Sequence, residues 1–117
     1  MKTFLAVYLG SAAGMDAWKN MDEAQRKPLE LAGVQAWHAW VQTNEKAIVD
    51  NGGPLGKTKR VSKQGIADVR NDMGAYTVVQ AESHEAAAKL FENHPHFTIF
   101  PGDAVEVMER LPIPAQT

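Results

Sequence analysis

The segment from residue 75 to residue 97 constrains the fold more than any other part of this sequence. Residues 75–81 read AYTVVQA, an apolar run rich in β-branched and aromatic residues that predicts a buried strand. Ser83 then precedes HEAAAKLFEN, a run of good helix formers whose first turn a serine hydroxyl can cap. His94-Pro95 ends this helix, because the residue before a proline disfavours the helical region. A strand that leads directly into a helix indicates a domain in which helices pack against a sheet.

The N-terminal part of the chain predicts the same order. Thr3–Leu9 is rich in aromatic and β-branched residues and predicts a first strand, followed by a loop of small residues. Asp22 with Gln25 matches a capping box, and a helical pattern follows to about Thr43. Pro28 either kinks this helix or lies in the first turn of a second one, and both alternatives keep the later residues helical.

Short strand patterns occur in the middle of the chain and near its C-terminus. Residues 46–50 (KAIVD) predict a strand that runs into a turn at residues 51–54 (NGGP). Residues 57–61 and 66–69 predict a hairpin around a polar turn. Asp103–Met108 alternates as a final strand with its two valines on one face.

The resulting order is strand, helix, strand or hairpin, strand, helix, strand. This order is typical of the ferredoxin-like βαββαβ fold, an α+β fold with an antiparallel sheet and both helices on one face. The other face would carry Val, Ile and Tyr side chains and stay uncovered in a single chain. Burying such a face contributes on the order of 10 kcal/mol before association costs, so we predict a two-fold homodimer.

Length and composition indicate one domain. The 117 residues, 44% of them hydrophobic, fit a single domain over residues 1–117 with a proline-rich tail from about residue 112, expected to be extended or frayed. A formal net charge of -2 provides no basic field for a phosphate backbone, so we expect no nucleic-acid partner. The only basic cluster, KTKR at residues 57–60, is typical of a solvated strand edge.

We expect a soluble, cytoplasmic protein. The absence of cysteine excludes disulfides and thiolate sites. No stretch approaches the roughly 20 apolar residues of a membrane helix, so we expect no membrane partner. The N-terminus, MKTFLAVYLGSAAG, superficially resembles a secretory signal, but its apolar run at residues 4–9 is short and is better explained as a strand.

Three stretches resemble the YCII-related family: NGGPLG at residues 51–56, GAYTVVQAESHEAAAKLFENHPHF at 74–97 and PGDAVEVM at 101–108. The similarity extends from Phe4 to Pro114 and is looser through the N-terminal helices. It implies ferredoxin-like subunits that form a dimeric α/β barrel. Family members are suspected of being enzymes, and a few act on intermediates of aromatic-ring degradation, so the resemblance also implies a small-molecule substrate.

The resemblance further implies a site in a cleft beside the sheet. There a histidine of the first long helix faces an acidic or polar residue near the end of the second helix. The histidine matches His38 in AWHAW, and the family's frequent Asp-Pro stands here as His94-Pro95. A carboxylate would orient the imidazole and stabilise its cation, whereas two histidines must divide the acid/base work differently.

His38 shares its predicted helix face with three apolar residues, Leu31, Val34 and Val41. It also lies between Trp37 and Trp40. One interpretation is a histidine of the core or dimer interface whose ring nitrogens bind backbone carbonyls. The other is a general base, because an imidazole desolvated by tryptophans is neutral at pH 7 and accepts a proton. Trp37 and Trp40 would then form apolar walls of a substrate pocket.

His94 and His96 lie two residues apart, a spacing at which the side chains of an extended segment share a face. The chain has neither an HxxxH nor an HExxH motif, so we expect no metal and no other cofactor. His94 is expected to be the polar partner of His38, the alternative being a residue at a helix C-terminus that interacts with the helix dipole. His96 is expected either to contact the substrate or to lie in a surface loop. Asp50 either joins the site from its strand end or only forms the neighbouring turn.

Two hypotheses for the function remain. In the first, the protein is an enzyme that carries out proton abstraction, isomerisation or elimination on a small cyclic or carbonyl compound, with His38, His94 and Asp50 as catalytic residues. In the second, it is a non-enzymatic dimeric ligand-binding or regulatory module with structural histidines. If His94 faces His38, the two rings must titrate as a coupled pair.

Overall fold

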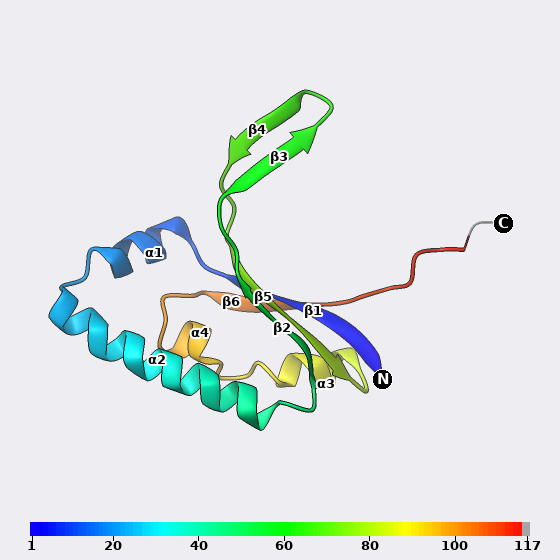
Figure 1. Ribbon diagram of the computed structural model, residues 1–117, viewed down its shortest axis with the longest axis horizontal. Coiled ribbons are helices and arrows are strands. Elements are labelled where there is room, and N and C mark those ends of the chain that lie inside the picture. Colours follow the sequence, from blue (N-terminus) through cyan, green and yellow to red (C-terminus); the bar gives the residue numbers. More distant parts are fainter. Residues whose placement is uncertain (116–117) are drawn as a thin grey trace.

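The computed structural model describes residues 1–115, which form a four-stranded sheet, a projecting hairpin and helices on one side of the sheet (Figure 1). The strands are β1 (Lys2–Leu9), β2 (Ile48–Pro54), β3 (Thr58–Ser62), β4 (Gly65–Val69), β5 (Met73–Ala81) and β6 (Ala104–Glu109). The helices are α1 (Ala12–Lys19), α2 (Glu23–Thr43), α3 (His84–Lys89) and α4 (Pro95–Thr98).

The main sheet has the strand order β2-β5-β1-β6, and every neighbouring pair is antiparallel. The chain passes from β1 through α1 and α2 to one edge strand, β2. It then passes from β5 through α3 and α4 to the other edge strand, β6. This is the ferredoxin-like arrangement, so the α+β fold class predicted from the sequence is confirmed.

The core lies between the inner face of the sheet and the helices α2 and α3. Phe4, Ala6 and Tyr8 alternate along β1 and are all 0% exposed, as expected for a strand with one face on a core. The residues that pack on them are Trp37 and Trp40 of α2, Ala87 of α3 and Phe91, which follows α3. Aromatic rings therefore provide most of the buried area that holds the helices on the sheet.

α2 is one continuous helix with Pro28 inside it, which decides between the two alternatives for this segment. Asp22 is its N-cap, but the Asp22 side chain makes no capping hydrogen bond. The buried Gly33 and the half-buried Trp37 and Trp40 form the face that α2 turns to the core. The face predicted to pack on the core is offset by one residue from the observed face. Leu31, Val34 and His38, which belong to the predicted face, are exposed. The large indole rings bury more area than the aliphatic side chains, so they decide the rotation of the helix.

The loop predicted after the first strand is wrong, because residues 12–19 form α1. Ser11 is the N-cap, and its Oγ accepts a hydrogen bond from the Gly14 N–H at 3.1 Å. The small residues at the start of α1 carry no apolar period. The helix depends instead on its cap and on the packing of Trp18 against Phe100, whose ring centroids are 5.9 Å apart.

The turn predicted at residues 51–54 is the second half of β2. This strand pairs with β5 as far as Pro54, but its register shifts on either side of Asp50. Gly52 adopts a positive φ of 66°, and a side chain there would overlap the Tyr76 carbonyl. The glycine-rich stretch is therefore a bulged edge strand rather than a terminating turn.

The second predicted helix is shorter than its sequence suggests. Ser83 caps α3 as predicted, with its Oγ accepting from the Ala86 N–H at 3.1 Å, but the helix ends at Lys89. Irregular turns follow to Asn93, which has a φ of 56°. Pro95 then begins α4, so HPHF starts a helical turn and is not the extended segment that was predicted.

The predicted hairpin is confirmed and projects from the body of the molecule (Figure 1). Its strands pair in the register that sets Val61 opposite Ile66. Beyond β6, residues 111–115 have no regular secondary structure and are exposed. The remainder of the predicted proline-rich tail, residues 116–117, lies outside the described residues.

The bulge in β2 gives a stability prediction with an internal control. Gly52→Ala combines a left-handed backbone with an overlap on the β5 backbone, so we expect it to lower the free energy of unfolding by about 2 kcal/mol or more. At Gly53 an added Cβ meets no atom within 4 Å. Gly53→Ala should therefore change stability by no more than about 0.5 kcal/mol in the same urea titration. Equal effects of the two substitutions would contradict the bulge geometry.

Candidate functional site

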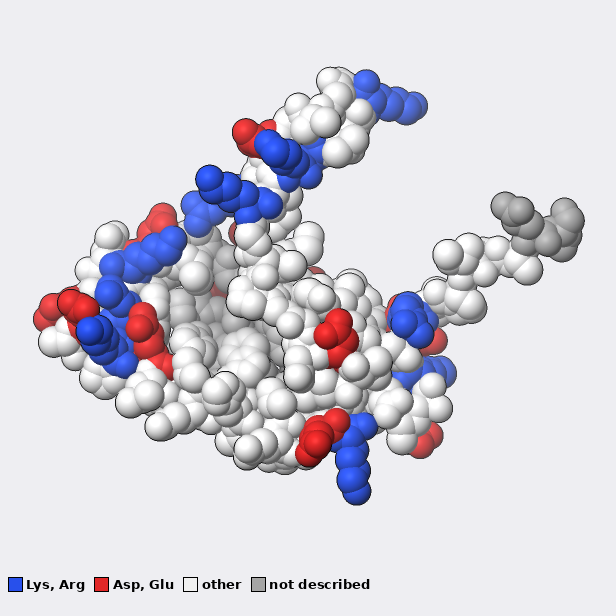
Figure 2. Space-filling model, in the orientation of Figure 1, with Lys and Arg blue, Asp and Glu red and all other residues white. Residues whose placement is uncertain are grey.

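A cavity of about 700 Å³ lies between α1 and α2 on one side and the ends of β1, β2 and β5 on the other. Figure 2 shows it as a hollow in the molecular surface beside the helices. Two connecting segments complete its walls, residues 70–72 before β5 and residues 100–102 before β6. The volume is within the range of about 300 to 1,000 Å³ that is typical of small-molecule sites.

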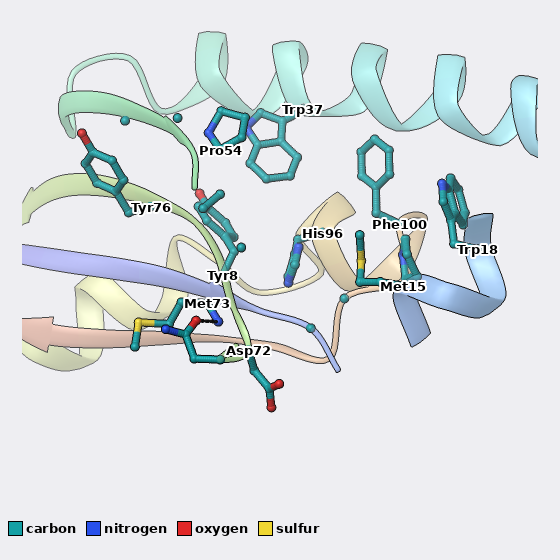
Figure 3. A pocket seen from close by; sticks show the side chains of 18 of the residues that line it. Tyr8, Met15, Trp18, Trp37, Pro54, Asp72, Met73, Tyr76, His96 and Phe100 are labelled. Carbon is teal, nitrogen blue, oxygen red and sulfur yellow. Dashed lines mark hydrogen bonds between the residues drawn. The ribbon is translucent and has the colours of Figure 1, made fainter. Parts of the chain in front are cut away.

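Aromatic rings form the wall on the helical side (Figure 3). Phe100 lies between Trp18 and Trp37, with ring centroids 5.9 Å and 6.1 Å away. Gly33 of α2 lies against the Phe100 ring, and a Cβ at this position would overlap it. The glycine therefore lets α2 approach closely enough to close the wall. Flat apolar walls of this kind suit a planar ring.

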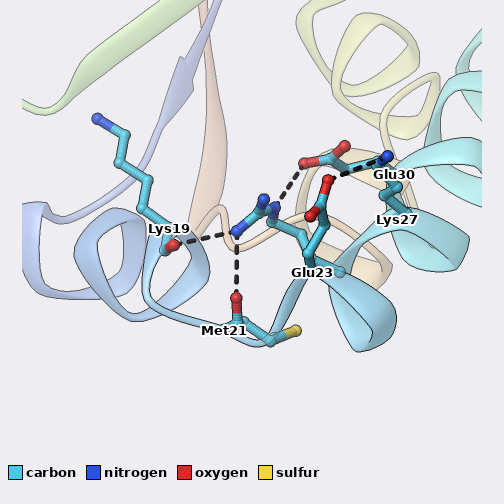
Figure 4. A network of polar contacts seen from close by, with 6 residues as sticks. Lys19, Met21, Glu23, Lys27 and Glu30 are labelled. Atoms are coloured by element: carbon cyan, nitrogen blue, oxygen red, sulfur yellow. Dashed lines mark hydrogen bonds and ion pairs between the residues drawn. The ribbon is translucent and has the colours of Figure 1, made fainter.

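Arg26 holds α1 over the cavity (Figure 4). Its Nη1 donates to the carbonyl of Lys19 at 3.0 Å and to that of Met21 at 3.1 Å. Its Nε pairs with Glu30 at 3.1 Å, one turn further along α2. These carbonyls at the end of α1 have no partner within their own helix, so the guanidinium satisfies them. Because α1 supplies Trp18 to the cavity wall, this arginine stabilises the site from outside.

Tyr8 lines the cavity on the side of the sheet. The Thr77 hydroxyl donates to the Asn51 carbonyl at 3.3 Å, so the Tyr8 hydroxyl is the donor in its 2.9 Å bond to Thr77 Oγ1. Burial raises the pKa of Tyr8 to about 12, and the hydrogen bond with Thr77 acts in the opposite direction with a smaller effect than burial. Tyr8 therefore stays neutral and offers the cavity a ring rather than a charge.

His96 lines the cavity and is half-buried, with its ring directed into the site (Figure 3). Its Nε2 lies 2.7 Å from the Leu9 carbonyl oxygen, which can only accept, so Nε2 carries a proton. Among the described residues, Nδ1 has no hydrogen-bond partner and is left as the basic nitrogen. Gly102 lies directly against the ring, where any side chain would overlap it. A fixed imidazole with one free nitrogen is what a general base requires.

His94 is 0% exposed and holds α4 in place. Its Nδ1 accepts the backbone N–H of His96 at 3.0 Å, so this imidazole is the N-cap of α4. The rings of Trp37 and Trp40 enclose it, with centroids 4.5 Å and 4.7 Å away. Burial lowers the pKa of His94 to about 4, and the neighbouring His96 contributes in the same direction. His94 is therefore a neutral hydrogen-bond acceptor.

The second ring nitrogen of His94 is unusual. Since Nδ1 accepts, the neutral ring carries its proton on Nε2, and this buried atom has no hydrogen-bond partner in the described chain. The surrounding indole rings stand at 89° and 69° to the imidazole. Aromatic faces are weak acceptors and offset only part of the cost of the missing bond.

His38 and His94, the two residues predicted to form a catalytic pair, lie in different environments. His38 is exposed and lines the cavity. His94 is buried, and the histidine that affects its charge is His96. The reason is the rotation of α2 by one residue, which turns Trp37 toward the core and His38 toward solvent.

The other sequence candidates divide between the cavity and the scaffold. Trp37 lines the cavity, whereas Trp40 packs in the core and donates its Nε1–H to the Leu90 carbonyl at 2.7 Å. Asp50 is exposed, and its carboxylate accepts the Gly52 N–H at 2.9 Å. Asp50 therefore has a local structural contact in the bulge of β2, which replaces the turn of its alternative interpretation.

Sequence reasoning missed the polar residues that precede β5. Arg70 and Asp72 line the cavity, and the carbonyl of Asp72 accepts the Gly10 N–H at 2.9 Å. This bond ties the segment to the end of β1. The segment has no motif of its own. Only the pairing of β1 with β5 could have indicated that this segment lies beside Gly10, the residue after β1.

Two kinds of feature are missing from residues 1–115. Their His, Asp and Glu side chains form no group of three or more that could hold a metal ion. None of the helices in this part of the chain is long and apolar enough to cross a membrane.

Comparison with solved structures identifies a protein of the same fold. The chain is similar to 5-chloro-2-hydroxyhydroquinone dehydrochlorinase (TftG) from Burkholderia phenoliruptrix AC1100, solved in complex with 2,5-dihydroxybenzoquinone. The TM-score is 0.55 and the sequence identity 19%, over 94% of this chain and 93% of that one. At this identity the likeness shows the fold alone. No protein-family model matches the chain, and no curated protein sequence matches it.

The buried cap gives a pH-dependence prediction. The folded pKa of His94, about 4, lies below its ordinary value of 6.5, so the unfolded chain binds the proton more readily. The stability that this group contributes is complete above pH 6.5 and is lost as the pH falls toward 4. We expect the free energy of unfolding to fall by about 2 kcal/mol between pH 7.5 and pH 5. Urea titrations at several pH values measure this.

His94→Asn tests the origin of that loss, because asparagine is a good N-cap that does not titrate. The variant should lose most of the pH dependence over the same range. His84→Asn, which changes an exposed histidine outside the cavity, should retain it. An unchanged pH dependence in His94→Asn would show that another group is responsible.

Proposed function

We propose that this protein is a small-molecule enzyme that acts on a planar cyclic substrate by acid/base chemistry without a cofactor. The observation that carries the proposal is His96, an imidazole held by the Leu9 carbonyl with a free basic nitrogen beside an aromatic-walled cavity. The shared fold with a dehydrochlorinase that binds 2,5-dihydroxybenzoquinone supports a hydroxylated or quinonoid ring as the substrate class. Membership of the YCII-related family, suggested by the sequence motifs, is part of this proposal.

In the proposed reaction, Nδ1 of His96 takes a proton from a ring hydroxyl or from a carbon next to a carbonyl. The electron pair left behind forms a new C=O or C=C bond, and a leaving group departs or a proton is returned to another ring atom. The step is an elimination or an isomerisation and needs no oxidant. The Leu9 carbonyl stabilises the imidazolium, since it accepts a hydrogen bond from Nε2–H.

The other residues have supporting roles in this proposal. Trp37 would stack on the substrate ring. His38 would transfer a proton between the solvent and the substrate atom that is protonated at the end of the reaction. Both residues line the same cavity. His94 would act only through the backbone of His96, and Asp50 only through the shape of the bulge in β2.

A ligand-binding module without catalysis is the second candidate. The observation in its favour is that no described hydrogen bond joins His96 or His38 to a carboxylate. An imidazole without such a partner is a weaker base than the histidine of a hydrolase triad. In this alternative the cavity binds a ring compound and His96 only donates or accepts a hydrogen bond.

We also expect a homodimer, because apolar side chains on the outer sheet face stay uncovered in the single chain. Leu5 is 37% exposed and Met108 is 44% exposed. A cytoplasmic location is expected from the absence of cysteine.

The assignment of His96 can be tested with a panel of hydroxylated and chlorinated hydroquinones and quinones, followed by absorbance and by mass spectrometry of the products. For a substrate that is turned over, we expect His96→Gln to lower kcat by about 100-fold or more, with a small change in KM. His38→Gln should have a smaller effect. His84→Gln, the matched control outside the cavity, should have none.

Two outcomes would contradict the proposal. Full activity of His96→Gln would remove this residue from the reaction. Saturable quenching of tryptophan fluorescence by a ring compound, without any product from the whole panel, would favour the ligand-binding module.

A further inference from the structure

The strand side of the large cavity carries polar side chains, in contrast to the aromatic wall on its helical side (Figure 3). These polar side chains belong to Asn51 in the bulge of β2 and to Arg70, Asn71 and Asp72 in the segment before β5. The reaction proposed above uses none of them. A cavity with one apolar side and one polar side can fix the orientation of a ligand that has both kinds of surface.

Arg70 is the one arginine or lysine in the described lining of this cavity. Within residues 1–115 its guanidinium forms neither an ion pair nor a hydrogen bond. Arg26, by comparison, uses its guanidinium for two backbone carbonyls and for Glu30. The N–H groups of Arg70 are therefore free to bind a ligand.

The backbone that carries Arg70 is held in place on its C-terminal side. The side-chain oxygen of Asn71 accepts the Met73 N–H at 2.9 Å, and the Asp72 carbonyl accepts the Gly10 N–H at 2.9 Å. These bonds fix the segment against the end of β1. A backbone that is fixed before the ligand arrives loses little freedom on binding, which lowers the entropic cost of the complex.

Asp72 is the one carboxylate in the described lining, and it is not paired with Arg70. No ion pair joins the two side chains, although only Asn71 separates them in the sequence. Figure 3 shows the Asp72 side chain pointing away from the rings of Trp37 and Phe100. The guanidinium therefore stays available to an anionic group of a ligand.

The rest of the cavity is less favourable for an anionic group. The faces of the aromatic rings carry partial negative charge. The free Nδ1 of His96 is an acceptor and also repels an anionic oxygen. Arg70, in contrast, presents its donors in a planar fork that matches the oxygens of a carboxylate. The chemistry of the lining thus orients a charged ring compound with its anionic oxygens toward Arg70.

We propose that Arg70 is the subsite for an anionic oxygen substituent, and that the ligand of this cavity is a planar ring with a carboxylate or an ionised hydroxyl. Arg70 binds this substituent, while a neutral hydroxyl of the same ring meets Nδ1 of His96. The inference rests on the proposed function, because it names the substrate class for the same cavity. Binding can nevertheless be measured without turnover.

Isothermal titration calorimetry at about pH 7.5 tests the subsite with three probes. They are 2,5-dihydroxybenzoate, its neutral amide 2,5-dihydroxybenzamide, and 2,5-dihydroxybenzoquinone, whose ring hydroxyls are acidic. We expect Arg70→Gln to weaken the binding of at least one of the two anions tenfold or more, and that of the amide less than twofold. The anion that is affected shows whether the subsite takes a carboxylate or an ionised hydroxyl.

Further variants separate a specific contact from a general effect of charge. Arg70→Lys keeps the charge but loses the planar fork, so it should weaken anion binding by only about threefold. Arg60→Gln removes an exposed arginine of β3 that does not line the cavity, and this matched control should bind all three probes as the parent chain does. Circular dichroism of every variant should match that of the parent chain.

Three binding results would overturn the proposal. Arg70→Gln could bind both anions as tightly as the parent chain. The parent chain could bind none of the probes at about 1 mM. His38→Gln could weaken anion binding where Arg70→Gln does not, which would move the anionic group to α2.

The subsite and the proposed function can fail separately. Anion binding that depends on Arg70, without any product from the turnover panel, would support the subsite and favour the ligand-binding module. Turnover that depends on His96 but not on Arg70 would keep the enzyme and overturn the subsite.

Discussion

Burial of the Tyr8 ring is the constraint on which most of this structure depends. Tyr8 is 0% exposed, and its ring lies 4.9 Å from that of Trp37, 5.1 Å from that of His94 and 5.3 Å from that of His96. One side chain of the central strand therefore positions α2 and α4 together. Its hydroxyl must also be satisfied, and the bond to Thr77 ties it to β5. The aromatic packing and the hydrogen bond to Thr77 both hold the Tyr8 side chain. Together they fix its position at the inner end of the cavity.

The same aromatic cluster gives two neighbouring histidines different chemistry. His94 is enclosed by indole rings and accepts a backbone N–H, so its proton affinity is low and its role is structural. His96, two residues later, is half-buried and donates to the Leu9 carbonyl, so its other nitrogen remains free toward the cavity. Environments that give neighbouring titratable groups different roles are typical of functional sites. The capped turn of α4 holds this pair in place.

The scaffold and the site are built from different parts of the chain. The sheet and α2 provide the rigid frame, whereas connecting segments provide much of the polar lining of the cavity. The bulged end of β2 and the segment before β5 both belong to this lining, and both continue into the projecting hairpin. Connecting segments on a rigid frame commonly carry function, because they change without disturbing the core. The hairpin and the candidate site are thus continuous in the chain.

The sequence by itself determined the order of the elements and the fold class. Runs of β-branched and aromatic residues and the Ser83 cap act through neighbours in the chain, so they can be interpreted without a structure. It also indicated that His96 and Trp37 belong near a ligand, and both line the cavity, although their function stays a prediction.

Only the tertiary structure decided the details of the site. The helical period allows either of two adjacent faces of α2 to pack on the core. Burial of Trp37 and Trp40 selected the face that leaves His38 outside the core. Pairing with β5 turned the glycine-rich residues 51–54 into a bulged strand instead of a loop. The cap formed by His94 gave α4 its single turn. Each of these outcomes depends on a partner that is distant in sequence, and such a partner is present only after the chain has folded.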